Sequence, residues 1–203
     1  IYMQKDTLRY RIGVATYSVG VAYNNRKTSL QFIQQEMNNI TALSNETCQL
    51  GIQSRNMVLY IAKKDSPQPI RLMSSVGKQL PLYCTGLGRA LLAYKSEEEI
   101  RSLFPEVLTA YTPHTIATIN DLLKELELTR QRGYAVEHEE TNLMVNCIAV
   151  SLDYNNAPIA ALSISIPTFR ISESKEKEAV QILWEAKQRI ETHFKMYGVD
   201  FGN

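Results

Sequence analysis

The sequence has little cysteine and no long apolar run. Its 203 residues contain three cysteines, Cys48, Cys84 and Cys147, and no Cys-x-x-Cys spacing. This odd, widely spaced set argues against a disulfide framework or a zinc ribbon and favours a reducing compartment. No apolar stretch approaches the roughly 18 residues that a membrane span needs, and charged residues interrupt the N-terminal segment where a signal peptide would lie. We therefore expect a soluble, cytoplasmic protein with no membrane partner.

Excess charge of one sign is also missing. Lysine and arginine total 22 and aspartate and glutamate 21, which gives a formal net charge of +1. This balance argues against a polycationic nucleic-acid coat, and a hydrophobic fraction of 44% argues against a disordered chain. The chain begins at Ile1 rather than at methionine, and residues 9–13 are β-prone although an isolated strand cannot bury a face. These two features favour a fragment whose first strand belongs to a unit upstream.

Helical and strand patterns alternate along the rest of the chain. Apolar residues at helical spacing begin at Leu30, and further helix start signals stand at Ser96, Thr118 and Ser172. Strands interspersed with helices, with a hairpin late in the chain, predict an α+β fold. The predicted strands occupy residues 47–52, 57–62, 70–76, 134–136, 146–154 and 159–166.

The predicted hairpin of residues 146–166 carries the most information. Strand periodicity gives each strand one bulky apolar face and one face of small residues. The small residues are Cys147, Ala149 and Ser151 on the first strand and Ala161, Ser163 and Ser165 on the second.

The loop of this hairpin decides whether the two small faces coincide. A three- or five-residue loop centred on Asn156 places Cys147 opposite Ser165 and merges the faces, whereas a two-residue Asn155-Asn156 turn places Cys147 opposite Ile164. Pro158 favours the longer loop. A merged face leaves space and hydroxyl donors for a small polar ligand. The alternative is that small residues admit a closely packed helix, and the residues alone leave both interpretations open.

Glycines precede a strong helix-forming segment at residues 86–93. Backbone N–H groups at such a helix start, near Gly86 and Leu87, could bind a carboxylate. A dinucleotide site is not indicated, because Leu91 stands where the third glycine would be. The alternative interpretation is that Gly86 and Gly88 serve tight helix packing.

A histidine stands among carboxylates in residues 137–140 (EHEE). Alternate side chains of an extended segment face opposite ways, so these four cannot converge on a metal, even with His114 as a remote partner. We expect no metal, and either a solvated acidic turn or one inward-pointing glutamate.

Cys147 or Cys84 with a histidine could form a nucleophile–base pair, but no motif fixes such a geometry, and a thiol among apolar strand residues is typically inert.

These segments, in this order, resemble the IclR family of bacterial transcriptional regulators. The resemblance implies an α+β, GAF/PAS-like antiparallel sheet with flanking helices, preceded by a linker helix. It divides the chain into a remnant of a winged helix-turn-helix domain (1–13), a linker helix region (14–28) and an effector-binding domain (29–203). The matching segments are residues 10–13 (YRIG), 80–93 (LPLYCTGLGRALLA), 133–140 (GYAVEHEE), 147–150 (CIAV) and 160–165 (AALSIS).

The resemblance also implies a function and partners. Family members bind operator DNA through an N-terminal domain, form homodimers or homotetramers, and respond to small organic acids. We therefore expect the sensing domain of a repressor that binds a small carboxylate effector, which is a keto acid, a sugar acid or an aromatic acid, without catalysis and without a cofactor. Two alternatives stay open: a Cys-dependent hydrolase or amidase, and a pure oligomerisation module whose small-residue face packs a partner helix.

Carried over by position, the resemblance implies specific ligand contacts. The family commonly has Gly-hydrophobic-Arg-Cys before the hairpin strand, where this chain has Met144-Val145-Asn146-Cys147. Met144 thus replaces a flexible glycine and Asn146 a cation, which bears on pocket entry and effector choice. The expected ligand-binding residues are Leu80, Gly86, Leu87, Glu137, Cys147, Ser163 and Ser165, with Leu72 and Val145 as further apolar walls.

Overall fold

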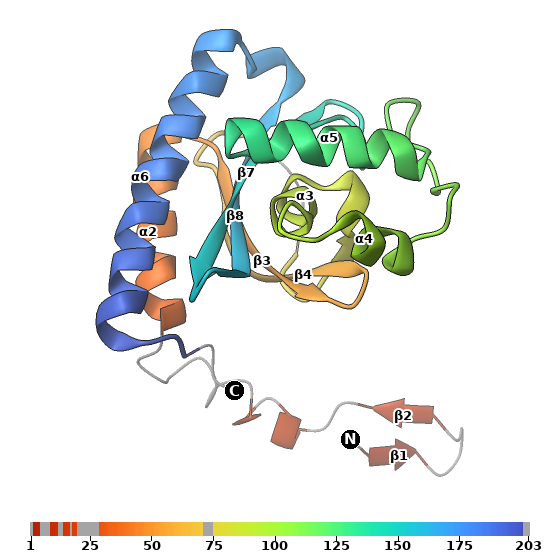
Figure 1. The fold of residues 1–203 in the computed structure, drawn as a ribbon. Coiled ribbons are helices and arrows are strands. Elements are labelled where there is room, and N and C mark those ends of the chain that lie inside the picture. The colour runs from red at the N-terminus through yellow and green to blue at the C-terminus, as the bar shows by residue number, and fades with distance from the viewer. Residues whose placement is uncertain are drawn as a thin grey trace.

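A six-stranded antiparallel sheet organises the chain (Figure 1). The computed structural model describes residues 2–4, 9–11, 14–16, 18–19, 29–70 and 75–200. The strand order β5-β4-β3-β8-β7-β6, with helices on both faces, confirms the predicted α+β class. The strands are β3 (Thr47–Ser54), β4 (Met57–Lys64), β5 (Gln79–Pro81), β6 (Ala135–His138), β7 (Val145–Tyr154) and β8 (Ala157–Pro167). The helices are α2 (Ser29–Ser44), α3 (Gly86–Leu92), α4 (Glu97–Leu103), α5 (Ile119–Arg132) and α6 (Glu173–Tyr197), with short 3₁₀ turns at Leu82–Cys84 and Thr168–Arg170.

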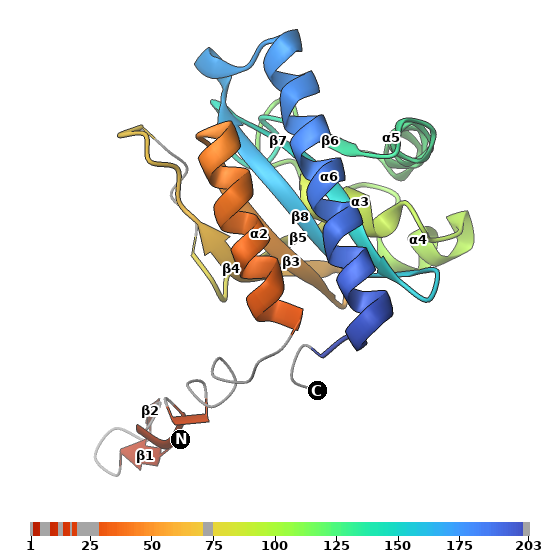
Figure 2. The same ribbon diagram turned by 90° about the vertical axis from the view of Figure 1, so that its left-hand side faces the viewer.

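The two faces of the sheet carry different helix layers. Helices α2 and α6 lie side by side across one face, and α3, α4 and α5 lie on the other (Figures 1 and 2). The bulky faces of β7 and β8, represented by Ile148 and Leu162, are buried in the core beneath α2 and α6. The small faces, represented by Ala149 and Ala161, are buried in the core that contains α3. Period-two alternation in the hairpin therefore sets which layer each strand face contacts.

The helix start signals are confirmed. Ser96 and Glu99 form a complete capping box before α4, because each side chain bonds the other residue's backbone N–H. The side chains of Thr118 and Ser172 cap α5 and α6. Among the described helices, none combines the length and the apolar character of a membrane span.

The predicted pairing of the hairpin is right, but the predicted loop is wrong. Cys147 pairs with Ser165, so the small faces do merge. The loop is nevertheless the two-residue Asn155-Asn156 turn, with φ values of 51° and 61° that suit a type I′ turn. A bulge next to Leu152 and Asp153 shifts the register by one residue and restores the pairing that the short turn alone would have lost.

The N-terminal and 70–76 predictions are tested only in part. β2 (Arg9–Arg11) is a strand and pairs with β1 (Tyr2–Gln4), while residues 12 and 13 lie outside the described residues. In the linker region, residues 14–16 and 18–19 are helical, and the other positions of 14–28 lie outside the described residues. Residues 71–74 of the predicted strand 70–76 lie outside them too, and its described residues form no strand. β5 lies further along, at Gln79–Pro81.

Candidate functional site

A small cavity lies between the start of α3, the hairpin face and the loop before β7. We call it the α3 cavity. Its volume is about 30 Å³, enough for one or two water molecules, so an organic acid requires its walls to move apart. Seven of the nine predicted site residues line it: Leu80, Gly86, Leu87, Glu137, Val145, Cys147 and Ser163. Leu72 lies outside the described residues, and Ser165 is absent from the lining.

The start of α3 is pressed against the sheet. Thr85 caps the helix, since its Oγ1 accepts from the Gly88 N–H at 3.1 Å and donates to the Pro81 carbonyl at 3.1 Å. A Cβ at Gly88 would lie 2.1 Å from the Leu82 carbonyl oxygen, so only glycine fits there. A Cβ at Gly86 would lie 3.3 Å from the Cys147 Cβ. The first amides of a helix have no intrahelical acceptor, and Gly86 and Leu87, which begin this helix, line the cavity.

The small-residue face is divided between helix packing and the α3 cavity. Ala149 and Ala161 pack against α3, which is the close helix packing that small residues permit. Cys147 and Ser163 line the α3 cavity instead. The helix on this face belongs to the same chain, so the small residues here do not leave the face open for a partner helix.

Ser163 is the most informative residue of the cavity. Its side chain is 1% exposed, and its Oγ finds no hydrogen-bond partner among the described residues. A buried hydroxyl without a partner is destabilising, so this atom is suited to bonding a water or a ligand in the cavity.

Ser165 lies beneath the cavity wall. Its hydroxyl donates to Gln49 Oε1 at 3.0 Å and lies 3.1 Å from the Cys147 Sγ. Both of those partners line the cavity. Ser165 therefore holds wall residues in place, and its direct contact with a ligand stays a prediction.

The four residues of the acidic segment diverge, as expected. Glu137 points inward and accepts from the Glu140 and Thr141 backbone N–H groups. His138 bonds the Asn146 side chain at 2.9 Å, and Glu140 forms a buried ion pair with Arg89. No group of three potential metal ligands occurs among the residues that the structure describes.

Burial sets the protonation of the cavity's acidic groups. It raises the pKa of Glu137 to about 7, against the lowering effect of the two backbone N–H donors. Burial also raises the pKa of the Cys147 thiol well above its ordinary value. A nucleophilic cysteine needs a lowered pKa, and no histidine bonds this thiol in the described part of the chain. The Cys147 thiol therefore lacks the environment of a catalytic nucleophile.

Several lining residues were not predicted from the sequence. Tyr60 and Lys78 come from β4 and from the turn before β5. No strand was predicted at residues 79–81, so Lys78, which directly precedes that strand, was not expected beside the sheet. The other unpredicted lining residues are Gln49, Thr85, Thr141 and Asn142.

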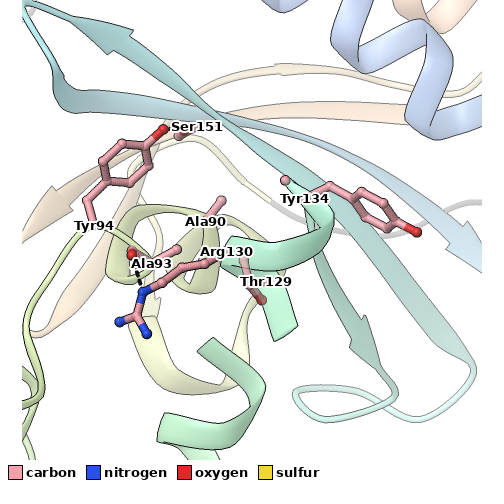
Figure 3. Close-up of a pocket in the computed structure, with 8 residues that line it drawn as sticks. Ala90, Ala93, Tyr94, Thr129, Arg130, Tyr134 and Ser151 are labelled. Atoms are coloured by element: carbon pink, nitrogen blue, oxygen red, sulfur yellow. Dashed lines mark hydrogen bonds between the residues drawn. The ribbon is translucent and has the colours of Figure 1, made fainter. Parts of the chain in front are cut away.

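A second, larger cavity lies at the opposite end of α3 (Figure 3). Its volume is about 190 Å³, and the side chains of Tyr94, Arg130 and Ser151 in its wall already have partners. The Tyr94 hydroxyl lies 3.1 Å from Ser151 Oγ, and Arg130 donates to the carbonyls of Ala93 and Lys95. None of the predicted site residues lines it. The unpartnered Ser163 favours the α3 cavity as the functional site.

Comparison with known proteins decides the family. A profile described as "Bacterial transcriptional regulator IclR C-terminal" matches residues 22–192. This chain belongs to the IclR family. Its fold is accordingly that of the family's C-terminal domain, which confirms the predicted GAF/PAS-like fold.

Two curated relatives agree with this assignment. The transcriptional regulator KdgR of Dickeya chrysanthemi is 32% identical over 192 residues, which are 94% of this chain and 63% of that protein. The transcriptional repressor AllR of Escherichia coli K12 is 31% identical over 194 residues, which are 95% of this chain and 72% of that protein. Both are helix-turn-helix regulators rather than enzymes, so the IclR chain is not the hydrolase or amidase that its cysteines left open.

Solved structures of domains from transcriptional regulators have the same fold. The C-terminal domain of E. coli KdgR superposes with a TM-score of 0.73 at 32% identity, and covers 81% of this chain and 96% of that one. The PobR inducer-binding domain from Acinetobacter, a double mutant in complex with 3-hydroxybenzoic acid, superposes with a TM-score of 0.72 at 25% identity. That comparison covers 79% of this chain and 96% of PobR's.

Proposed function

We propose that this IclR-family chain is the sensing part of a cytoplasmic repressor, and that a small organic acid binds in the α3 cavity. The effector is a keto acid, a sugar acid or an aromatic acid. Its carboxylate accepts from the amides of Gly86 and Leu87 and from the Ser163 hydroxyl. Glu137 accepts from its hydroxyl groups, and Leu80 and Val145 supply apolar walls.

The single observation that carries this proposal is the unpartnered Ser163 Oγ in a cavity that Gly86 and Leu87, the first residues of α3, also line. Three donors at one end of a cavity match a carboxylate, which is an acceptor only. The PobR inducer-binding domain, of the same fold, holds an aromatic acid and so supports the ligand class.

Regulation follows from differential binding. An acid acts as a switch only if it binds one arrangement of a homodimer or homotetramer better than another. We infer that residues 14–28 form a linker helix that transmits the change, and that residues 1–13 end a winged helix-turn-helix domain which contacts operator DNA. A changed spacing of two such domains alters their fit to paired half-sites.

Isothermal titration calorimetry with a panel of keto, sugar and aromatic acids tests the site. For the tightest ligand, Ser163→Ala is expected to weaken binding by about 1–3 kcal/mol while the fold stays intact. Ser151→Ala is the matched control, because Ser151 lies on the same small-residue face but lines the second cavity. Unchanged affinity in Ser163→Ala, or an equal loss in the control, contradicts the assignment.

A further inference from the structure

Lys78 stands at the outer end of the α3 cavity. The turn that carries it is fixed to β4, because the Gly77 N–H donates to the Tyr60 carbonyl at 2.8 Å and the Tyr60 N–H donates to the Lys78 carbonyl at 3.0 Å. Gly77 has a φ of +86°, which permits this tight turn. The backbone of Lys78 is therefore held at the cavity, while its side chain reaches into solvent at the rim.

The ammonium group of Lys78 forms no ion pair with another residue that the structure describes. Among the lining residues that the structure describes, Lys78 is the only cation and Glu137 the only acid. No hydrogen bond or ion pair with another described residue engages its ammonium group. Arg89, which is buried in the last turn of α3, contrasts with it, since its guanidinium is paired with Glu140.

We propose that Lys78 is a specificity-determining residue that binds a second anionic group of the effector, so that the chain prefers a dicarboxylic acid to the matching monocarboxylic acid. This inference rests on the proposed function, which places the first carboxylate at the inner end beside Ser163. A second carboxylate at the rim then lies beside the ammonium group of Lys78, the one cation among the described lining residues. Because Lys78 is exposed, both the ammonium group and the carboxylate stay partly hydrated. Such a partly exposed pair is expected to contribute about fivefold in affinity.

Three matched pairs of acids provide the test, each pair sharing its carbon skeleton. They are 2-oxopentanoate and 2-oxoglutarate, gluconate and glucarate, and 4-methylbenzoate and terephthalate. Calorimetry is run on the wild-type chain and on Lys78→Met, which keeps the length of the side chain and removes its charge. Lys78→Arg restores the charge, and Lys124→Met removes an exposed lysine of α5 that lies outside the α3 cavity.

In at least one pair, the diacid is expected to bind about fivefold more tightly than the monoacid. Lys78→Met removes that difference without weakening the monoacid, Lys78→Arg restores it, and Lys124→Met leaves it unchanged. Monoacid binding with no preference for the diacid, or a preference that survives Lys78→Met, overturns the role of Lys78 and leaves the proposed function standing. If none of the six acids binds the wild-type chain, both the proposed function and this inference fail.

Discussion

The buried carboxyl of Glu137 makes the stability of the domain depend on pH in a defined direction. Burial raises its pKa from 4.5 to about 7 in the folded chain. As pH rises above 4.5, the unfolded chain loses this proton first, so ionisation favours unfolding until the folded chain also ionises near pH 7. The stability that Glu137 contributes is therefore fully present below pH 4.5 and is lost between pH 4.5 and 7. A shift of this size corresponds to about 3 kcal/mol.

Glu137→Gln isolates this contribution, because glutamine cannot ionise but keeps an oxygen for the Glu140 and Thr141 N–H groups. The unfolding free energy of the variant, minus that of the wild-type chain, is expected to rise by about 3 kcal/mol between pH 4.5 and pH 8. Urea unfolding followed by fluorescence of Trp184, the single tryptophan, measures it at each pH. Glu98→Gln, on the exposed side of α4, is the reference for losing a surface carboxylate. A difference that does not change with pH refutes the buried, inward-pointing Glu137.

Three further predictions concern the backbone and DNA binding. Met144 has a φ of 67°, so Met144→Gly is expected to raise the unfolding free energy by about 1 kcal/mol and Met144→Ala to leave it unraised, as urea unfolding will measure. Gly88→Ala is expected to cost more than about 2 kcal/mol in the same assay, because its Cβ would collide with the Leu82 backbone. In a gel shift at about 150 mM salt, the chain is expected to bind operator DNA no better than unrelated DNA.

Periodicity and capping predicted most of the fold. The starts of α4, α5 and α6 were readable because a single side chain, as at Ser96, bonds the backbone of its own first turn. The face each hairpin strand presents was readable because side chains alternate. The length of the hairpin loop could not be predicted in this way. The short Asn155-Asn156 turn and the bulge at Leu152 each shift the register by one residue, and the two shifts offset each other, so the pairing is the same as with a longer loop.

The site was predicted where it depends on the hairpin and on α3, and missed where it depends on β4 and β5. An edge strand of three residues such as Gln79–Pro81 has too little alternation to locate from sequence, so Lys78 could not be placed on the wall. Ser165 shows a second limit. Alternation predicts the side of the sheet on which Ser165 lies. It does not predict that the side chain of Gln49, on the neighbouring strand, accepts a hydrogen bond from the Ser165 hydroxyl.

A crystal structure of the chain with its tightest-binding acid tests the central claim most directly. The account predicts that the α3 cavity widens and that one carboxylate oxygen lies within about 3.2 Å of the Ser163 Oγ, with the Gly86 and Leu87 amides donating to the same group. An acid bound in the second cavity beside Tyr94 and Ser151, with Ser163 still unbonded, would contradict it.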